Sequence, residues 1–128
     1  MKLRILHTND LHSNFDNFSK MSTLISKYKN ENTIILDGGD FADFKSIELQ
    51  GTKGIAAIEL LEEVGYDALT IGNNEMFNGV ETLEHMASHS SVPFISNNLV
   101  KKEMKLLDGY CSFLAGPLQE IVARYRKK

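Results

Sequence analysis

Hydrophobic and polar residues follow two different periods along the first part of the chain. Short apolar or β-branched runs that end in Gly, Asn or Asp are typical of buried strands that lead into loops. Such runs predict strands over residues 3–7, 33–36, 68–71 and 94–95. Between them, apolar residues at helical spacing predict amphipathic helices over residues 15–28, 54–64 and 80–89.

This alternation of strand and helix predicts an α/β fold, with a parallel or mixed sheet covered by helices and joined by right-handed crossovers. The periodicity weakens after Leu99, where residues 119–126 could form one last helix with a basic end. We therefore divide the chain into an α/β part, residues 1–100, and a tail, residues 101–128.

The composition is that of an ordinary globular protein, and it argues against a nucleic-acid polymer or a membrane as partner. The chain has 128 residues, of which 42% are apolar and 24% are charged, and its net charge is -3. That charge offers no basic surface for a nucleic-acid polymer and no cluster for an anionic membrane. No apolar run approaches the length of a membrane span. We expect neither partner.

The cysteine content and the N-terminal residues indicate in which cellular compartment the protein is expected. The sequence has a single cysteine, Cys111, which cannot form an intramolecular disulfide, so a reducing compartment is expected. Residues 1–7 contain a short apolar stretch without the pattern of a signal peptide. The expected location is cytoplasmic.

Each predicted strand is followed by residues that can bind a metal ion. In open parallel sheets, ligands bind beyond the carboxyl ends of the strands, so clusters distant in sequence meet at one edge. Carboxylate, imidazole and amide oxygen suit Mn²⁺, Mg²⁺, Zn²⁺ or Fe²⁺. Each cluster alone also fits a plain turn or helix cap, but their convergence favours a metal site. The clusters are Asp10 and His12, then Asp37 and Asp40, then Asn73, Asn74 and Glu75, then Asn97 and Asn98.

At these residues the chain resembles 5′-nucleotidases and 2′,3′-cyclic phosphodiesterases of the calcineurin-like metallophosphoesterase superfamily. The similarity covers roughly residues 3–100 and rests on ordered motifs. Residues 5–12 (ILHTNDLH) resemble the opening motif, and residues 36–41 (LDGGDF) resemble the second. Residues 71–75 (IGNNE) and 96–99 (SNNL) resemble the third motif and the strand end that follows it.

The resemblance implies a hydrolase with two divalent ions, Mn²⁺, Zn²⁺ or Mg²⁺. Asp10 and His12 would hold the first ion, Asp40 would bridge both, and Asn73 would bind the second. A metal-activated water would attack the phosphorus of a nucleotide or another phosphate ester. The implied fold is an αββα sandwich of two mixed sheets, of which this chain would be the N-terminal half.

The sequence departs from the family pattern in two ways. Asn74 stands where the family's third motif usually has His, and Asn donates a hydrogen bond but delivers no proton near neutral pH. We keep Asn74 as the candidate catalytic residue. The later histidines that complete both ions are also missing, because no histidine follows Asn98. A truncation, an internal deletion or a frameshift would each produce this pattern.

A half-sandwich would expose an apolar face, so we expect a homo-oligomer or a partner chain that supplies the missing half. The remaining histidines fit other roles: His7 a structural hydrogen bond, and His85 and His89 a solvated helix face rather than a shared ion. The leading hypothesis is a metal-dependent phosphoesterase of nucleotide catabolism. The alternatives are a non-catalytic remnant and a phosphate- or nucleotide-binding module.

Overall fold

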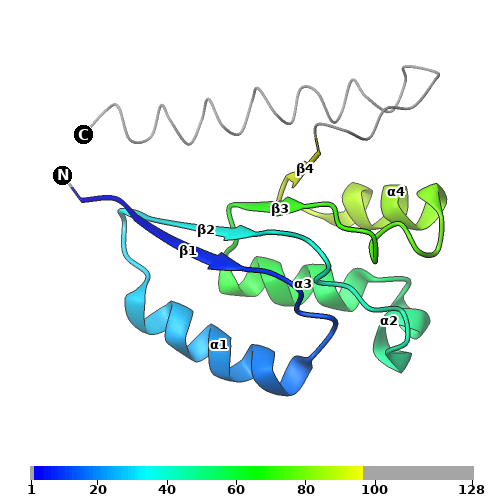
Figure 1. Ribbon diagram of the computed structural model, residues 1–128, viewed down its shortest axis with the longest axis horizontal. Helices are drawn as coiled ribbons and strands as arrows, with labels where there is room; N and C mark the ends of the chain where they lie inside the picture. The colour runs from blue at the N-terminus through cyan, green and yellow to red at the C-terminus, as the bar shows by residue number, and fades with distance from the viewer. Residues whose placement is uncertain (1, 97–128) are drawn as a thin grey trace.

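The computed structural model describes residues 2–96 and shows strands and helices in strict alternation, apart from one additional short helix (Figure 1). The order is β1 (Arg4–Thr8), α1 (Phe15–Tyr28), β2 (Thr33–Asp37), α2 (Ile47–Thr52), α3 (Ile55–Val64), β3 (Ala68–Thr70), α4 (Val80–His89) and β4 (Phe94–Ile95).

The described strands form one sheet in the order β1-β2-β3-β4, and every neighbouring pair is parallel. The prediction of an α/β fold with a parallel sheet is therefore confirmed. In the register of the first pair, Leu6 lies opposite Ile35 and Thr8 lies opposite Asp37. Because all strands run the same way, their carboxyl ends meet at one edge, where the loops bearing the candidate ligands begin.

The helices cover one face of this sheet. Figure 1 shows α1 and α3 on the same side of the strands, and α3 also contacts α2 and α4. Alternate residues of β2 point into this layer, so Thr33, Ile35 and Asp37 are all buried. The core between sheet and helices includes Ile58 and Leu61 of α3. Removal of this apolar surface from water is the main stabilising term.

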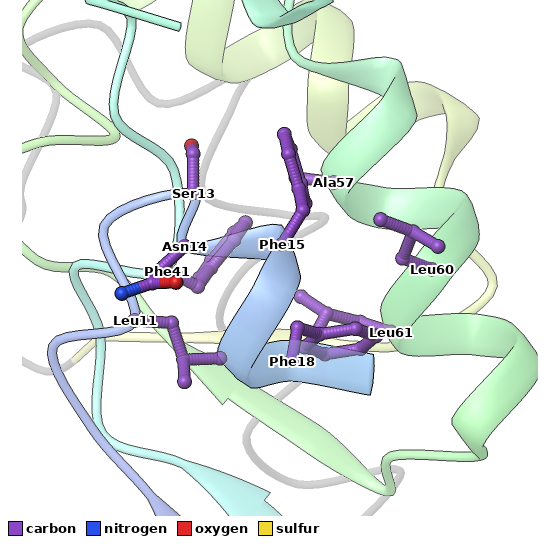
Figure 2. Close-up of a pocket in the computed structure, with 9 residues that line it drawn as sticks. All are labelled: Leu11, Ser13, Asn14, Phe15, Phe18, Phe41, Ala57, Leu60 and Leu61. Carbon is purple, nitrogen blue, oxygen red and sulfur yellow. The ribbon is translucent and has the colours of Figure 1, made fainter. Parts of the chain in front are cut away.

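A small apolar pocket lies where the β1–α1 loop meets the helix layer (Figure 2). Leu11 and Phe41 form its side towards the loops, while Phe15, Phe18 and Leu61 come from α1 and α3. Its walls are mainly apolar, and neither a carboxylate nor an imidazole lines the pocket. Its lining anchors the segments on either side of His12 and Asp40 in the core.

The helix ends follow from their capping residues. The Asn14 side chain caps α1 by accepting a hydrogen bond from the Asn17 backbone at 3.2 Å. Gly65 ends α3 in the left-handed conformation with φ 83°, which glycine adopts without steric cost. Both boundaries agree with the sequence pattern.

The structure differs from the sequence prediction at α2 and at several strand ends. Helix α2 was not predicted, because within it only Leu49 is buried and its six residues show no apolar stripe. Strand β2 continues to Asp37, and β3 ends at Thr70 rather than at Ile71. The predicted helix over 119–126, Cys111, Asn97 and Asn98 lie outside the described residues.

Candidate metal centre

The loops after β1 and β2 lie side by side and are joined by backbone hydrogen bonds. The Asp10 N–H donates to the Gly39 carbonyl at 3.1 Å, and the His12 N–H donates to the Asp40 carbonyl at 2.9 Å. The Ser13 N–H donates in turn to the Phe41 carbonyl at 3.1 Å. This ladder fixes the two loops relative to each other and places their side chains at the same edge.

These loops hold several residues in the left-handed region of backbone space. The φ angles are 54° at Asp10, 47° at His12, 53° at Ser13 and 57° at Asp40. Non-glycine residues are uncommon there, and each costs on the order of 1–3 kcal/mol that the surrounding structure must offset. Such strain is concentrated at functional sites, which is consistent with a site at this edge.

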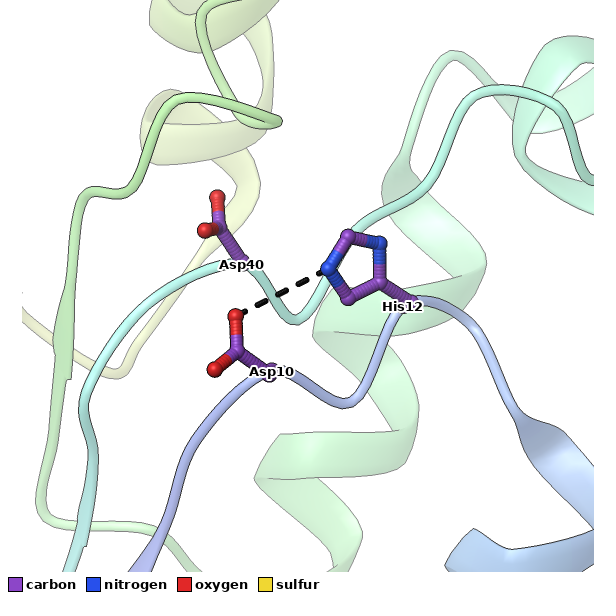
Figure 3. Close-up of side chains that lie close together, drawn as sticks. All are labelled: Asp10, His12 and Asp40. Carbon is purple, nitrogen blue, oxygen red and sulfur yellow. Dashed lines mark ion pairs between the residues drawn. The ribbon is translucent and has the colours of Figure 1, made fainter.

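The structure brings together Asp10, His12 and Asp40, three of the four residues predicted as metal ligands (Figure 3). One ligand atom from each lies within 4.8 Å of the others. His12 Nε2 is 3.7 Å from Asp10 Oδ1, and these two side chains are 47% and 60% exposed. Two carboxylates and one imidazole are a suitable donor set for Mn²⁺, Zn²⁺ or Mg²⁺, and an ion could reach them from solvent.

Asn73 and Asn74 flank this group on the loop after β3. With its amide turned to satisfy both neighbours, Asn73 donates to Asp40 Oδ2 at 3.3 Å. The Asn74 backbone N–H donates to Asp40 Oδ1 at 2.8 Å, and its side-chain Nδ2 is 2.9 Å from His12 Nδ1. Both predicted asparagines therefore contact the carboxylate or the imidazole of the group.

Glu75 is a buried brace below the group rather than an exposed ligand. Its side chain is 0% exposed and accepts hydrogen bonds from the Asp40 N–H at 3.0 Å, the Ala42 N–H at 2.9 Å and the Gly72 N–H at 2.7 Å. Burial raises the pKa of this carboxyl, and the backbone donors oppose that shift. The sequence pattern grouped Glu75 with metal-binding residues but gave no sign of this bracing role.

The close contact between the β2 and β3 loops requires glycine. A Cβ at Gly72 would overlap the Asp40 carboxylate and lie 2.5 Å from the Asp40 backbone nitrogen. A Cβ at Gly39, where φ is +104°, would lie 2.9 Å from the Gly72 nitrogen. The two glycines thus allow Asp40 to approach the loop that bears Asn73.

Asp37, the other carboxylate of the second cluster, faces the interior. It is 2% exposed, accepts hydrogen bonds from Thr8 Oγ1 and, at 2.8 Å, from the Gly39 N–H, and does not join the exposed group. Burial raises its pKa. Thr8 Oγ1 is also 2.9 Å from the Tyr66 hydroxyl, and burial raises the pKa of Tyr66 to about 12. This network joins β1, β2 and the loop that precedes β3.

Asp43, which the sequence pattern did not single out, lies beside His12. Its Oδ2 is 3.6 Å from His12 Nδ1. The Lys45 backbone N–H donates to Asp43 Oδ1 at 2.9 Å and lowers the pKa of this carboxyl. The available signal was the short spacing from Asp40 in a loop, which by itself fits an ordinary turn.

The remaining histidines lie outside the group. His85 and His89 lie one turn apart on α4, with ring centroids 4.4 Å apart and the rings tilted by 56°, and His89 Nδ1 is 2.8 Å from the His85 carbonyl. His7 lies on β1. Among the described residues, the group of Asp10, His12 and Asp40 includes none of these three.

The comparisons with known proteins agree with this geometry. The family model for calcineurin-like phosphoesterases matches residues 3–125. The chain belongs to the calcineurin-like phosphoesterase family. Members of this family are hydrolases that use divalent metal ions. The candidate metal centre lies within the matched range.

Two relatives show how much of a longer protein this phosphoesterase chain spans. YunD, an uncharacterized metallophosphoesterase of Bacillus subtilis, is 36% identical over 111 residues, covering 79% of this chain and 23% of the relative. Human 5′-nucleotidase is 31% identical over 127 residues, covering 79% of this chain and 21% of the relative. The chain therefore spans less than a quarter of the length of either protein.

A solved structure shows the same fold. The 5′-nucleotidase precursor from Thermus thermophilus superposes with a TM-score of 0.68 at 20% identity, covering 84% of this phosphoesterase chain and 24% of the other. Within residues 2–96, none of the helices is both long enough and apolar enough to cross a membrane.

Proposed function

We propose that this chain carries the first half of the metal site of a 5′-nucleotidase-type phosphoesterase, which hydrolyses nucleotides or related phosphate esters. The observation that carries the proposal is the group of exposed Asp10 and His12 with half-buried Asp40, with one ligand atom each within 4.8 Å. The group lies at the carboxyl edge of a parallel sheet, where ligands of such folds bind.

Each residue of the group has a proposed role. Asp10 and His12 would hold one ion, Asp40 would contribute its carboxylate to both ions, and Asn73 would offer its amide oxygen to the second. When bound, divalent ions lower the pKa of a coordinated water and neutralise phosphoryl oxygens. The short contacts of Asp40 with the asparagine loop, at 2.8 and 3.3 Å, support its central position.

Asn74 is proposed as the residue that touches the reacting phosphate ester. Its half-buried side chain lies beside His12 at the edge of the group, where its amide N–H could donate to a phosphoryl oxygen or to the leaving group. Since an amide delivers no proton near neutral pH, the leaving group has to take its proton from water. Esters with good leaving groups should therefore react faster than alkyl esters.

Nucleotides are the proposed substrate class because several relatives bear that activity in their names. These include human 5′-nucleotidase and the trifunctional nucleotide phosphoesterase YfkN of Bacillus subtilis, which is 36% identical over 93 residues. We also propose that further ligands for the two ions come from a second copy or another chain. The described residues provide one group of three ligands, fewer than two ions need.

The experiment is an assay of the full 128-residue chain on an aryl phosphodiester, with and without Mn²⁺. Asp40→Asn is the test variant, because Asn keeps the acceptor for the Asn74 N–H and removes the charge that would bridge the ions. Glu59→Gln, on the exposed surface of α3, is the control for loss of one charge. Turnover that depends on Mn²⁺ and is lost in Asp40→Asn alone supports the proposal.

Other outcomes separate the alternatives. No turnover by the wild type, with at most one bound ion, would favour a non-catalytic remnant. Nucleotide binding without turnover would favour a binding module. Equal turnover by the wild type and Asp40→Asn would contradict the proposed site, because hydrolysis would then not depend on the bridging carboxylate.

A further inference from the structure

The two ring nitrogens of His12 face two different carboxylates. Nε2 lies 3.7 Å from Asp10 Oδ1, on the side of the candidate ion site. Nδ1 lies 3.6 Å from Asp43 Oδ2, on the other side of the ring. Asp43 itself does not belong to the group of Asp10, His12 and Asp40.

Asp43 is held in place by the two loops that carry the site. Ser13 Oγ accepts the Asp43 backbone N–H at 2.7 Å and donates to the Asp43 carbonyl at 3.3 Å. Asp43 Oδ1 accepts the Lys45 N–H at 2.9 Å, which leaves Oδ2 directed at His12. The Asp43 side chain is 21% exposed, less than half the value for His12 at 47%. This is a fixed and partly enclosed carboxylate.

A histidine that binds an ion through one nitrogen carries its proton on the other, and that N–H usually donates to a carboxylate or a carbonyl. We propose that Asp43 is a positioning residue that accepts the Nδ1–H of His12 and so directs the Nε2 lone pair at the ion site. This proposal rests on the metal site proposed above. A separation of 3.6 Å is an ion-pair distance and too long for a hydrogen bond, so the proposal requires the imidazole to turn towards Asp43 when the ion binds.

Asn74 also contacts His12 Nδ1, but this contact favours the tautomer of His12 that cannot bind an ion through Nε2. Its Nδ2 is 2.9 Å from His12 Nδ1. An amide N–H can donate to Nδ1 only when that nitrogen carries no proton, which places the proton on Nε2 and blocks the ion site. The carboxylate of Asp43 is therefore needed to favour the tautomer that binds an ion, and Asn at position 43 would remove that preference.

The test measures Zn²⁺ affinity and the His12 tautomer in the full 128-residue chain. Asp43→Asn keeps an oxygen for the Lys45 N–H, so the loop is retained, and Glu59→Gln again controls for loss of one charge. Long-range ¹H–¹⁵N spectra report which ring nitrogen carries the proton, and His12→Ala assigns its signals among the four histidines. Circular dichroism checks that each variant is folded.

We expect Asp43→Asn to bind Zn²⁺ about 10–100-fold more weakly than the wild type. Its free form should show more of the Nε2–H tautomer, and Glu59→Gln should match the wild type in both respects. A Zn²⁺ affinity within about twofold of the wild type, with an unchanged tautomer, would overturn the role of Asp43 alone. A wild type whose His12 signals do not respond to Zn²⁺ would overturn both this role and the proposed metal site.

Discussion

Replacing Glu75 by Gln tests whether the buried carboxylate braces the loops that carry the site. In the wild type, Oε2 accepts the Asp40 and Gly72 N–H groups and Oε1 accepts the Ala42 N–H. Gln has nearly the same shape but offers only one oxygen. With that oxygen at the Oε2 position, the amide NH₂ meets the Ala42 N–H, and this donor loses its partner.

The magnitude follows from the number of affected donors. One buried N–H without a partner costs about 1–3 kcal/mol, and the two remaining bonds lose the extra strength that a charged acceptor gives. Relief from burying a charge offsets part of this loss, since burial raises the pKa of Glu75. We expect the free energy of unfolding to fall by about 2–4 kcal/mol, a large share of the stability of a small domain.

Urea denaturation followed by circular dichroism measures this change at neutral pH in the presence of EDTA, which removes any contribution from bound ions. With a slope of about 2 kcal/mol per molar urea, the midpoint should fall by roughly 1–2 M. Glu59→Gln makes the same chemical change on the exposed surface of α3, and it should stay within about 0.5 kcal/mol of the wild type.

A Glu75→Gln midpoint equal to that of Glu59→Gln would refute the bracing role, because three donors to a fully buried carboxylate could not then contribute to stability. A second readout is Mn²⁺ affinity, which should fall in Glu75→Gln because the carboxylate holds the backbone of Asp40. Loss of stability with unchanged Mn²⁺ affinity would show that the brace supports the fold without positioning the ligand.

Two further substitutions test other parts of the site. Asp37 has a raised pKa in the folded state, so its contribution to stability is present below its ordinary value of 3.8 and is lost as pH rises through the raised value. In urea titrations with EDTA from acid to neutral pH, the stability of the wild type relative to Asp37→Asn should therefore fall as pH rises; a rising difference would contradict this sign. Gly72→Ala should lower stability by about 1–3 kcal/mol and weaken Mn²⁺ binding, because the new Cβ overlaps Asp40. Gly51→Ala is the control in the same assays: its Cβ would meet nothing within 4 Å, and it should stabilise α2 by about 0.5–1 kcal/mol. Equal effects of the two alanines would be evidence against the tight contact at Gly72.

The periodicity of the sequence was enough to predict the strands, three of the helices and the parallel sheet. It also predicted which loops meet, because parallel strands end at the same edge. The loops that carry Asp10, His12 and Asp40 were therefore expected to meet, and the family resemblance singled out these three residues, together with Asn73, as ligands. Helix α2 was not predicted, because it buries only Leu49 and has too few apolar residues to show helical periodicity.

The local residue pattern, without the family resemblance, could not separate carboxylates that occur in similar loops. Asp37 and Asp40 both flank a Gly-Gly pair, yet the first is buried against Thr8 while the second joins the exposed group. That difference depends on the register of β1 and β2, in which Thr8 lies opposite Asp37. Periodicity identifies the strands, whereas the register decides which side chain faces the helices.

The roles of Glu75 and Asp43 were decided by tertiary structure alone. Glu75 contacts Asp40 across 35 positions of the sequence, and Asp43 approaches His12 across the paired loops. Local patterns carry no information about such contacts, because a carboxylate acquires its role from the donors that packing places around it. The sequence thus determined the elements and the edge at which a metal site can form. The packing of three loops decided which carboxylates face the candidate ion site and which ones hold the others in place.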